Sequence, residues 1–449
     1  MIRTIERPPL SQKIFFALGQ LGWSLAVFSV ANLLVYFYMP PEEGTEAMFP
    51  TFIFQGAIIG SLTLVGLINF GGRAFDAITD PLIASWADRK EAKIGKRKAL
   101  MAIACVPLAL FSFLIFYPPF GENLNLNSIW VTISIFVFYF FYTLYVIPYT
   151  ALISELGHHP EDRMNISTLI AVTWTLGFMI GSTVYALQAY FEPTYGPTYA
   201  FQLTIGIFTI VGFVFMLIPI LFLNENKYAM KGTTEATAIT SLKEILKNKN
   251  YTLFAIADMI YWLSLTFIQL GIGFYVPILF GFDKSQATEF LAISFVTSFL
   301  FYAPVNFLVK RFGKRILILV AFVLFSVTFG MLAMIEFLLI DKKTLFYTIA
   351  LLSGFPLAVF MIVPNALIAD FVHIHKAETG DNYSAMFYGF RNFTTKFGIS
   401  IANLLFPSLL LFGRSTENPQ GVILTAWMAF IFCILGFVLF YFVKEIKED

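Results

Sequence analysis

About twelve long runs of apolar residues dominate this chain of 449 residues. A helix needs about 20 apolar residues to cross the hydrocarbon core of a bilayer. Charged residues make up only 13% of the chain, against about 25% in a soluble domain. The sequence therefore predicts an all-α polytopic membrane protein. The expected spans are residues 13–39, 53–86, 99–117, 128–153, 166–190, 200–224, 252–281, 286–308, 316–337, 345–371, 383–411 and 422–443.

The runs fall into two groups of six. We expect an N-terminal six-helix half at residues 1–224, a cytoplasmic linker at 225–250 with a surface helix from Thr240, and a C-terminal half at 251–449. The halves echo each other at an offset of 215–218 residues: Gly95-Lys96-Arg97 recurs as Gly313-Lys314-Arg315, and Glu155 is matched by Asp370. Two parallel six-helix repeats resemble the plan of major facilitator transporters, whose substrate site lies near the bilayer midplane.

Lysine and arginine residues set the expected orientation. With the N-terminus inside, the inner segments hold 22 of them, the outer loops four, and the spans three. Cytoplasmic loops of membrane proteins carry such an excess. We therefore expect a multi-pass protein of the plasma or inner membrane, with both termini cytoplasmic.

The second run carries three charged residues. Arg73, Asp76 and Asp80 are spaced three and four residues apart, so they share one helix face. A charge at the bilayer centre costs about 2.5–3.5 kcal/mol on insertion scales, so three on one helix indicate a use. The two carboxylates, helped by Thr79, can bind a metal ion such as Na⁺ through hard oxygens, or they can share a proton. A structural ion-pair network is the alternative interpretation, and the sequence leaves both open.

Other charges belong to the same hypothesis. Lys396 and Arg391 in the eleventh run, and Asp258 in the seventh, balance Arg73 and the two acids in number. Intramembrane charges normally face one another or a wet cavity. We expect a coupling or charge network of Arg73, Asp258, Arg391 and Lys396. Structural pairing is the favoured interpretation for Arg73 and Arg391, Lys396 can act in gating or in structural pairing, and Asp258 can also be a helix-end residue. Three residues at inner helix ends are candidates for gate salt bridges or solvated ends: Glu155, Arg163 and Asp370.

Polar and aromatic residues within the spans are candidates for a substrate cavity. Trp23 could stack on a sugar face, although a packing role is the simpler interpretation. The same choice holds for the whole set: Gln20, Trp23, Ser24, Tyr149, Thr150, Trp174, Tyr261, Trp262, Gln269, Tyr388 and Asn392. Gly177 and Gly181, four residues apart, favour close helix packing.

Several function classes find no support in the sequence. The net charge of +1 argues against a nucleic-acid partner. The two cysteines and four histidines have no metal-ligand spacing. No nucleophile–base pair and no phosphate-binding loop indicates an enzyme, and no cofactor beyond a coupling ion is expected.

Three motifs now carry a family resemblance. The stretch Arg73-x-x-Asp76-Ala77-Ile78-x-Asp80-Pro81, followed by Gly95-Lys96-Arg97, resembles the second-helix signature of the glycoside–pentoside–hexuronide:cation symporters, the melibiose-carrier family. The run Ile147-Pro148-Tyr149-x-Ala151-Leu152-x-x-Glu155 is similar to the fourth-helix motif. The segment from Ala369-Asp370 to Met386-Phe387-Tyr388-Gly389 and Lys396 is similar to the motif of the tenth and eleventh helices.

The resemblance implies roles and also marks departures. It implies that Asp76 and Asp80 bind the cation and that Lys396 lies near them. The melibiose carrier has sugar-binding acids on helices one and four, where this chain has Ser24 and Val146, and an arginine near Ala171. These departures argue against a galactoside. The vertebrate lysophospholipid symporters are similar to this family, so a lipid-like substrate stays an alternative.

The function that follows from the resemblance is secondary active transport. We expect symport of a sugar, glycoside or uronide with Na⁺ or H⁺, by rocking of the two halves around a central site. The expected partners are the small-molecule substrate, the coupling cation and the lipid bilayer, and the protein is expected to work as a monomer. The rivals are a lysolipid or other amphipathic-solute symporter, and a receptor or scaffold that binds without transport.

Overall fold

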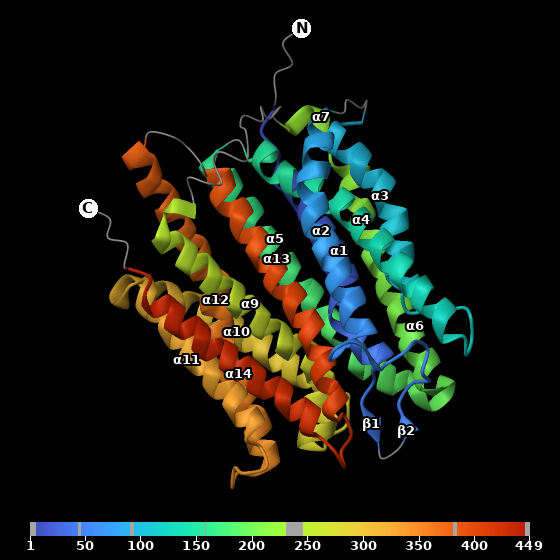
Figure 1. Cartoon of the computed structure of the whole chain (residues 1–449). Coiled ribbons are helices and arrows are strands. Elements are labelled where there is room, and N and C mark those ends of the chain that lie inside the picture. The colour runs from blue at the N-terminus through green and yellow to red at the C-terminus, as the bar shows by residue number, and fades with distance from the viewer. Residues whose placement is uncertain are drawn as a thin grey trace. The chain divides into compact units, whose positions relative to one another are not determined.

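The computed structural model describes residues 6–43, 46–89, 94–157, 159–229, 246–379 and 384–444. Within these residues the chain forms twelve helices of at least 19 residues (Figure 1), which confirms the expected all-α class. The chain folds into two compact units, described here one at a time. The first unit is Met1–Met39, Met48–Gln55 and Leu67–Glu235; the second is Pro40–Ala47, Gly56–Gly66 and Ala236–Asp449.

The first unit is a bundle of six long helices. In this unit α1 packs against α5 and α6, and α3 packs against α4 and α6. Local signals set several ends: the Asn123 side chain accepts a hydrogen bond from the first turn of α4, and Pro160 opens α5. The helices are α1 (Leu10–Tyr38), α2 (Leu64–Arg89), α3 (Lys96–Leu114), α4 (Leu124–Leu156), α5 (Pro160–Ser182), α6 (Val184–Phe222) and the short α7 (Glu225–Tyr228).

Helix α6 contains the boundary between the fifth and sixth expected spans. Its regular geometry breaks at Gly196, where φ is 75° and ψ is 165°. Glycine adopts this conformation without steric cost, and the flanking Pro193 and Pro197 favour an interruption. Residues before Gly196 therefore extend the fifth span, and those after it form the sixth, between the expected limits of 190 and 200.

Glycines bring α1 and α5 close together. A side chain at Gly177 would collide with Ser24, and one at Gly181 would meet Phe28. Small residues at such positions let helix backbones approach closely in membrane proteins. The packing role expected for Gly177 and Gly181 is confirmed.

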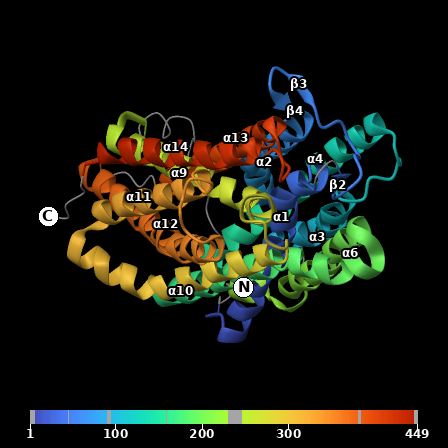
Figure 2. The ribbon, with the colours of Figure 1, turned by 90° about the horizontal axis from the view of Figure 1, so that it is seen from below.

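The second unit repeats the helix pairing of the first. Helix α9 packs against α13 and α14, and α11 packs against α12 and α14, as α1 and α3 do with their partners (Figure 2). The elements are α9 (Lys249–Phe274), a π-helical turn η1 (Tyr275–Phe280), α10 (Gln286–Phe312), α11 (Lys314–Ala333), α12 (Lys342–Thr379), α13 (Ser384–Leu409), a 3₁₀ turn η2 (Leu410–Phe412) and α14 (Gln420–Tyr441).

The repeat extends to matching helix starts. Gly95 and Gly313 precede α3 and α11 with φ of 107° and 85°, conformations that glycine tolerates. Arg97 then pairs with Glu155 at 2.8 Å, and Lys314 pairs with Asp370 at 2.5 Å. Each unit therefore ties the start of its third helix to the end of its fourth through one ion pair.

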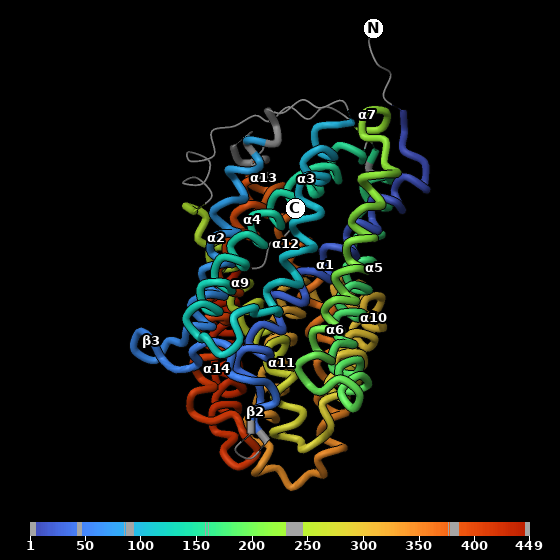
Figure 3. Tube along the Cα trace, turned by 90° about the vertical axis from the view of Figure 1, so that its right-hand side faces the viewer, coloured from blue at the N-terminus to red at the C-terminus, as the bar shows by residue number. Residues whose placement is uncertain are grey.

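Helix α7, labelled near the N-terminal end of the chain in Figure 3, carries a side chain that caps α3. The two carboxylate oxygens of Glu225 accept hydrogen bonds from the backbone N–H groups of Arg97 at 3.1 Å and Lys98 at 2.8 Å. These groups belong to the first turn of α3, where no helical acceptor is available. The Glu225 side chain thus caps the N-terminus of α3, a role that usually belongs to the residue just before the helix.

The second expected span begins later than the sequence suggested. We expected it from residue 53, but α2 starts at Leu64, because residues 57–63 form a hairpin of β3 (Ala57–Ile59) and β4 (Leu62–Thr63) that turns at Gly60. A second hairpin pairs β1 (Glu42–Glu43) with β2 (Glu46–Ala47). Arg414 holds it through a 2.6 Å ion pair with Glu42. The surface helix expected from Thr240 lies outside the described residues.

Ten stretches of the described chain are long and apolar enough to cross a membrane. One of them, Glu161–Phe222, contains both the fifth and sixth spans. Helix α2, which carries Arg73, Asp76 and Asp80, is not among them. The presence of three charged residues in α2 is therefore explained by the site that they form, which is described next.

Candidate cation and substrate site

The centre of the candidate site is the Asp76 carboxylate on α2. It is fully buried. The Thr143 hydroxyl of α4 donates a hydrogen bond of 2.7 Å to Oδ1, and the Arg73 guanidinium lies 3.3 Å from Oδ2. A buried carboxylate requires such charged or hydrogen-bonded partners.

Hydroxyl and carbonyl oxygens surround this carboxylate. The Thr79 hydroxyl lies 3.3 Å from that of Thr143 and also bonds the backbone oxygens of Phe75 and Asp76 at 3.0 and 3.1 Å. Pro81 has no N–H, so the carbonyl of Ala77, four residues earlier, lacks its helical donor. Hard oxygen atoms of several kinds therefore gather within one turn of α2.

Asp80 belongs to the same surroundings through Tyr142. The Tyr142 side chain on α4 lies within electrostatic range of Arg73, Asp76 and Asp80. Both acids of α2 are therefore near the same part of α4. Carboxylate and hydroxyl oxygens are groups that suit a hard monovalent cation or a shared proton, and the cation site at Asp76 and Asp80 stays a prediction.

Sequence reasoning missed the residues that α4 contributes. Thr143 donates a hydrogen bond of 2.7 Å to Asp76, and the guanidinium of Arg73 lies over the Tyr139 ring, 5.3 Å from its centroid. Nothing within a run rich in tyrosine and phenylalanine marks these two positions. Only the alignment of α2 beside α4 identifies them, and that alignment is a property of the fold.

The charges of the second unit form a pair of their own. Arg391 on α13 bonds Asp258 on α9 through Nε at 2.8 Å, and its NH1 donates to the Asn365 side chain at 2.8 Å. Asp258 is buried well inside α9 and is not a helix-end residue. Lys396 lies half-buried on α13. Its relation to Asp76 and Asp80 stays a prediction.

An aromatic cluster in the first unit joins three of the predicted cavity residues. Trp23 on α1 lies 5.3 Å from Trp174 and 6.3 Å from Tyr149, between ring centroids. It also meets Tyr142 edge-on at 5.7 Å, so the cluster touches the residue that faces the acids. The indole N–H of Trp23 is buried and has no hydrogen-bond partner in the described part of the chain. This donor is available to a ligand.

Other predicted cavity residues of the first unit are held by the protein itself. Ser24 donates to the Leu21 carbonyl and packs on Gly177. The Tyr149 hydroxyl donates to the Phe16 carbonyl at 2.9 Å. Gln20 is buried, whereas Thr150 is exposed. Ser24 and Tyr149 therefore support helix contacts in this structure and do not line open space.

The predicted cavity residues of the second unit are distributed along two helices. On α9, Tyr261 is fully buried and stacks on Phe360 at 3.6 Å, and Trp262 is partly buried. Gln269, further along α9, lines a small cavity together with Ser294 of α10 and Ser353 of α12. Tyr388 and Asn392 on α13 are exposed.

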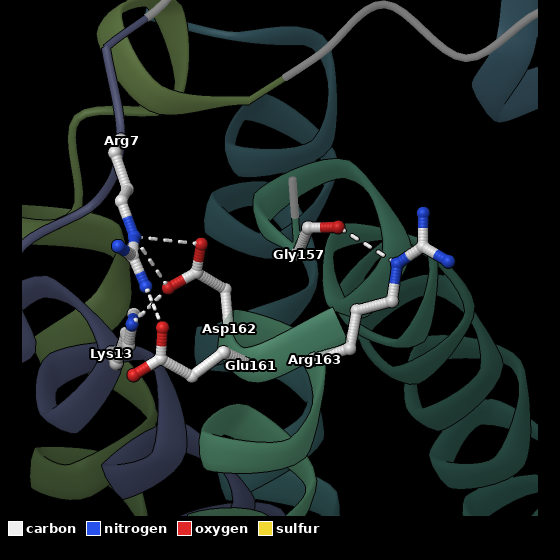
Figure 4. A network of polar contacts seen from close by, with 6 residues as sticks. All are labelled: Arg7, Lys13, Gly157, Glu161, Asp162 and Arg163. Atoms are coloured by element: carbon white, nitrogen blue, oxygen red, sulfur yellow. Dashed lines mark hydrogen bonds and ion pairs between the residues drawn. The ribbon is translucent and has the colours of Figure 1, made fainter. Parts of the chain in front are cut away.

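Two of the three predicted gate residues, Glu155 and Asp370, form ion pairs. Glu155 pairs with Arg97, as described above, and not with Arg163, whose Nε donates to the Gly157 carbonyl at 2.8 Å (Figure 4). A neighbouring network centres on Asp162, which receives bonds from Lys13 at 2.5 Å and Arg7 at 2.9 Å. This network was not expected from the sequence.

Comparison with known proteins identifies the family. The model of the family described as "MFS/sugar transport protein" matches residues 15–444, almost the whole chain. The chain belongs to this family. It is a multi-pass membrane transporter of the major facilitator superfamily and not an enzyme, and the resemblance to the glycoside–pentoside–hexuronide symporters is confirmed.

Relatives cover most of the chain at low identity. The isoprimeverose transporter of Lactiplantibacillus pentosus is 24% identical, over 91% of this chain and 82% of that protein. The putative glycoside/cation symporter YagG of Escherichia coli is 20% identical, over 96% and 89%. The sodium-dependent lysophosphatidylcholine symporter 1 of Xenopus tropicalis is 21% identical, over 83% and 78%.

Solved structures share the fold. The nucleoside transporter NupG matches with a TM-score of 0.66 at 14% identity, covering 97% of this chain and 99% of that one. A bacterial homologue of the human peptide transporters PepT1 and PepT2 matches with a TM-score of 0.68 at 10% identity. At these identities the likeness concerns the fold alone.

Proposed function

We propose that this transporter carries a sugar or glycoside together with a monovalent cation bound at Asp76 and Asp80. The observation that supports it most is the buried Asp76 carboxylate, which meets the Thr143 hydroxyl at 2.7 Å with Thr79 beside it. Relatives named isoprimeverose transporter and glycoside/cation symporter agree with this substrate class.

The proposed coupling acts through Arg73 and Tyr142. A cation at Asp76 competes with Arg73 for the carboxylate, because both positive charges seek the same oxygens. Tyr142 then links the acids to the Trp23 cluster, where a sugar face stacks on the indole. The cation can favour one conformation only through unequal affinity for the two states.

Uptake into proteoliposomes tests the cation site. In Asp76→Asn and Asp80→Asn, sugar uptake driven by a Na⁺ or H⁺ gradient should fall to the level of empty liposomes. Thr175→Val is the control, because this buried hydroxyl bonds the Ala171 carbonyl of its own helix. Gradient-driven uptake that persists in both acid variants would exclude the assignment.

A lysolipid symporter is the second candidate. It is favoured by the relative from Xenopus tropicalis, whose name specifies sodium and lysophosphatidylcholine. A thermal-shift panel of neutral sugars, uronides and lysophosphatidylcholine, each with and without Na⁺, separates the two. Stabilisation by the lysolipid alone would replace the sugar assignment.

We also propose both termini to be cytoplasmic, in the plasma or inner membrane, with the monomer as the working unit. The basic segments support this orientation: 22 lysine and arginine residues fall on the inner side and four on the outer. Protease protection of a C-terminal tag in sealed right-side-out vesicles tests it, and cleavage of the tag from outside would reverse the orientation.

A further inference from the structure

A second polar group on α2 has no role in the cation site. Asn69 lies one helical turn before Arg73, is fully buried, and has no hydrogen-bond partner for either Nδ2 or Oδ1 among the described residues. Nearly all buried polar groups in proteins have partners, and an unsatisfied one lowers the stability of the fold. An amide with both atoms unsatisfied therefore indicates a ligand that is bound for part of the time.

Two more unsatisfied groups belong to the same neighbourhood. Within the residues that the structure describes, the Tyr139 hydroxyl and the Nε of Arg73 are buried without hydrogen-bond partners, although NH1 of Arg73 bonds Asp76. The Tyr139 ring lies against Arg73 and packs on Gly72, where an added Cβ would come within 2.8 Å of the ring. Asn69, Gly72 and Arg73 share one helix face, so the three polar groups lie along one strip of the contact between α2 and α4.

The charges around this strip exclude most ligands. Arg73 repels a cation, so the strip does not continue the cation site. Asp76 and Asp80 follow one and two turns further along α2, which leaves a net charge of −1 on the stripe before a coupling cation binds. A carboxylate placed beside Asp76 would meet like-charge repulsion at low dielectric. An uncharged group with both donors and acceptors fits best.

We propose that Asn69, Arg73 and Tyr139 form a subsite for the hydroxyl groups of an uncharged sugar; this proposal rests on the function proposed above. A sugar hydroxyl donates to Asn69 Oδ1 and accepts from Asn69 Nδ2, Arg73 Nε–H or the Tyr139 hydroxyl. The subsite favours neutral sugars over sugar acids. A site built to bond a hydroxyl also rejects analogues that lack it.

The aromatic chain connects this subsite to the stacking surface. Tyr139 and Tyr142 meet edge-on at 6.2 Å between centroids, and Tyr142 meets Trp23 in the same way at 5.7 Å. Both ends carry a buried donor without a partner, Trp23 Nε1 and the Asn69 amide. One saccharide can thus stack on the indole and hydrogen-bond along the strip.

A comparison of two asparagines tests whether Asn69 is kept for binding. Asn127 on α4 is equally buried, but its amide is used: Nδ2 donates to the Gly121 carbonyl at 2.8 Å and Oδ1 accepts from Phe120 N–H at 3.1 Å. In detergent without ligand, Asn127→Leu should lower the thermal unfolding midpoint, whereas Asn69→Leu should leave it unchanged or raise it. A loss in Asn69→Leu as large as in Asn127→Leu would mean that Asn69 has a structural role, and would overturn the proposal.

Binding is measured on the full-length protein with fixed probes in Na⁺. The probes are D-glucose, D-xylose, D-galactose and their methyl glycosides, with D-glucuronate and D-galacturonate as acidic counterparts. At least one neutral probe should raise the unfolding midpoint of the wild type, with an affinity at least tenfold above that of its acid. Asn69→Leu should lower that affinity tenfold or more, and Asn127→Leu should not. No shift by any neutral probe, or equal shifts by the acids, overturns the proposal and leaves Asn69 as a buried-water site.

A second variant provides the same measurement should Asn69→Leu fail to fold. Asn69→Ala removes both amide groups and adds no bulk to the contact between α2 and α4. It should lower the affinity for the neutral sugar tenfold or more, and an unchanged affinity contradicts the proposal. Stabilisation by Na⁺ that disappears in Asp76→Asn reports on the cation site separately. The experiments can therefore reject the subsite and leave the proposed symport intact, or reject the cation site and leave the subsite intact.

Discussion

Replacement of Asp162 should destabilise the first unit more than any change to its exposed partner. The Asp162 side chain is 0% exposed and that of Lys13 only 6%, and they meet at 2.5 Å. Removing one member of such a buried pair costs about 3–5 kcal/mol, because the other charge is left unpaired. Arg7 also bonds Asp162, but its side chain is 51% exposed, and pairs of that kind contribute about 0–1 kcal/mol. Asp162→Ala should therefore lose at least three times the stability that Arg7→Ala loses.

The assay is thermal unfolding of the purified protein in detergent, with all variants at one salt concentration. Replacing a whole buried ion pair by apolar residues is often neutral. The double variant Lys13→Leu/Asp162→Leu should therefore recover most of the loss seen in Asp162→Ala. Equal losses in Asp162→Ala and Arg7→Ala, or a double variant no more stable than Asp162→Ala, would refute the reasoning from buried charge.

Three further predictions concern other contacts. Thr143→Val should weaken Na⁺-dependent stabilisation about tenfold, the effect of losing one oxygen ligand and its bond to Asp76; the same change at Thr175 should not. Burial raises the pKa of the Glu225 carboxyl above its ordinary value of 4.5. The stability that comes from this raised pKa is therefore fully present below pH 4.5, where the carboxyl is protonated, and is lost as the pH rises through the raised pKa. Unfolding midpoints should therefore increasingly favour Glu225→Gln over wild type from pH 5 upward, and a constant difference would contradict this. Arg414→Met removes the 2.6 Å pair with Glu42 and should speed proteolysis within residues 40–47, which a digestion time course checks.

The sequence predicts the helices well because each one has to cross a bilayer. Length and apolarity mark most of the spans, although helix α2 does not qualify by them and the fifth and sixth spans form one apolar stretch. The break near Gly196 falls within an expected boundary. The second span was placed too early, since apolar residues at 57–63 can form either a helix or a hairpin. Apolar content separates segments buried in the membrane from segments exposed to water, but it does not tell a helix from a hairpin.

The sequence predicted only some of the residues of the candidate site. Arg73, Asp76 and Asp80 are conspicuous because charges are rare in a span. Thr143, Tyr139 and the unsatisfied state of Asn69 depend on which residues of α2 and α4 face each other, and no periodic pattern carries that information. The ion pair of Glu155 was one of two expectations for that residue, but its partner could not be named, because Arg97 approaches from a different helix.

One guanidinium joins the two proposed binding events. Arg73 holds Asp76 with NH1, while its Nε is left without a partner in the Asn69 strip. A cation that takes over Asp76 lets Arg73 turn toward the sugar, and a sugar that bonds Arg73 leaves Asp76 more accessible to the cation. Linkage requires both effects to have the same size: if Na⁺ raises sugar affinity by some factor, the sugar must raise Na⁺ affinity by that factor. In Arg73→Gln, where no charge links the two sites, both factors should approach one together, and a large factor that survives there would show that coupling runs through other residues.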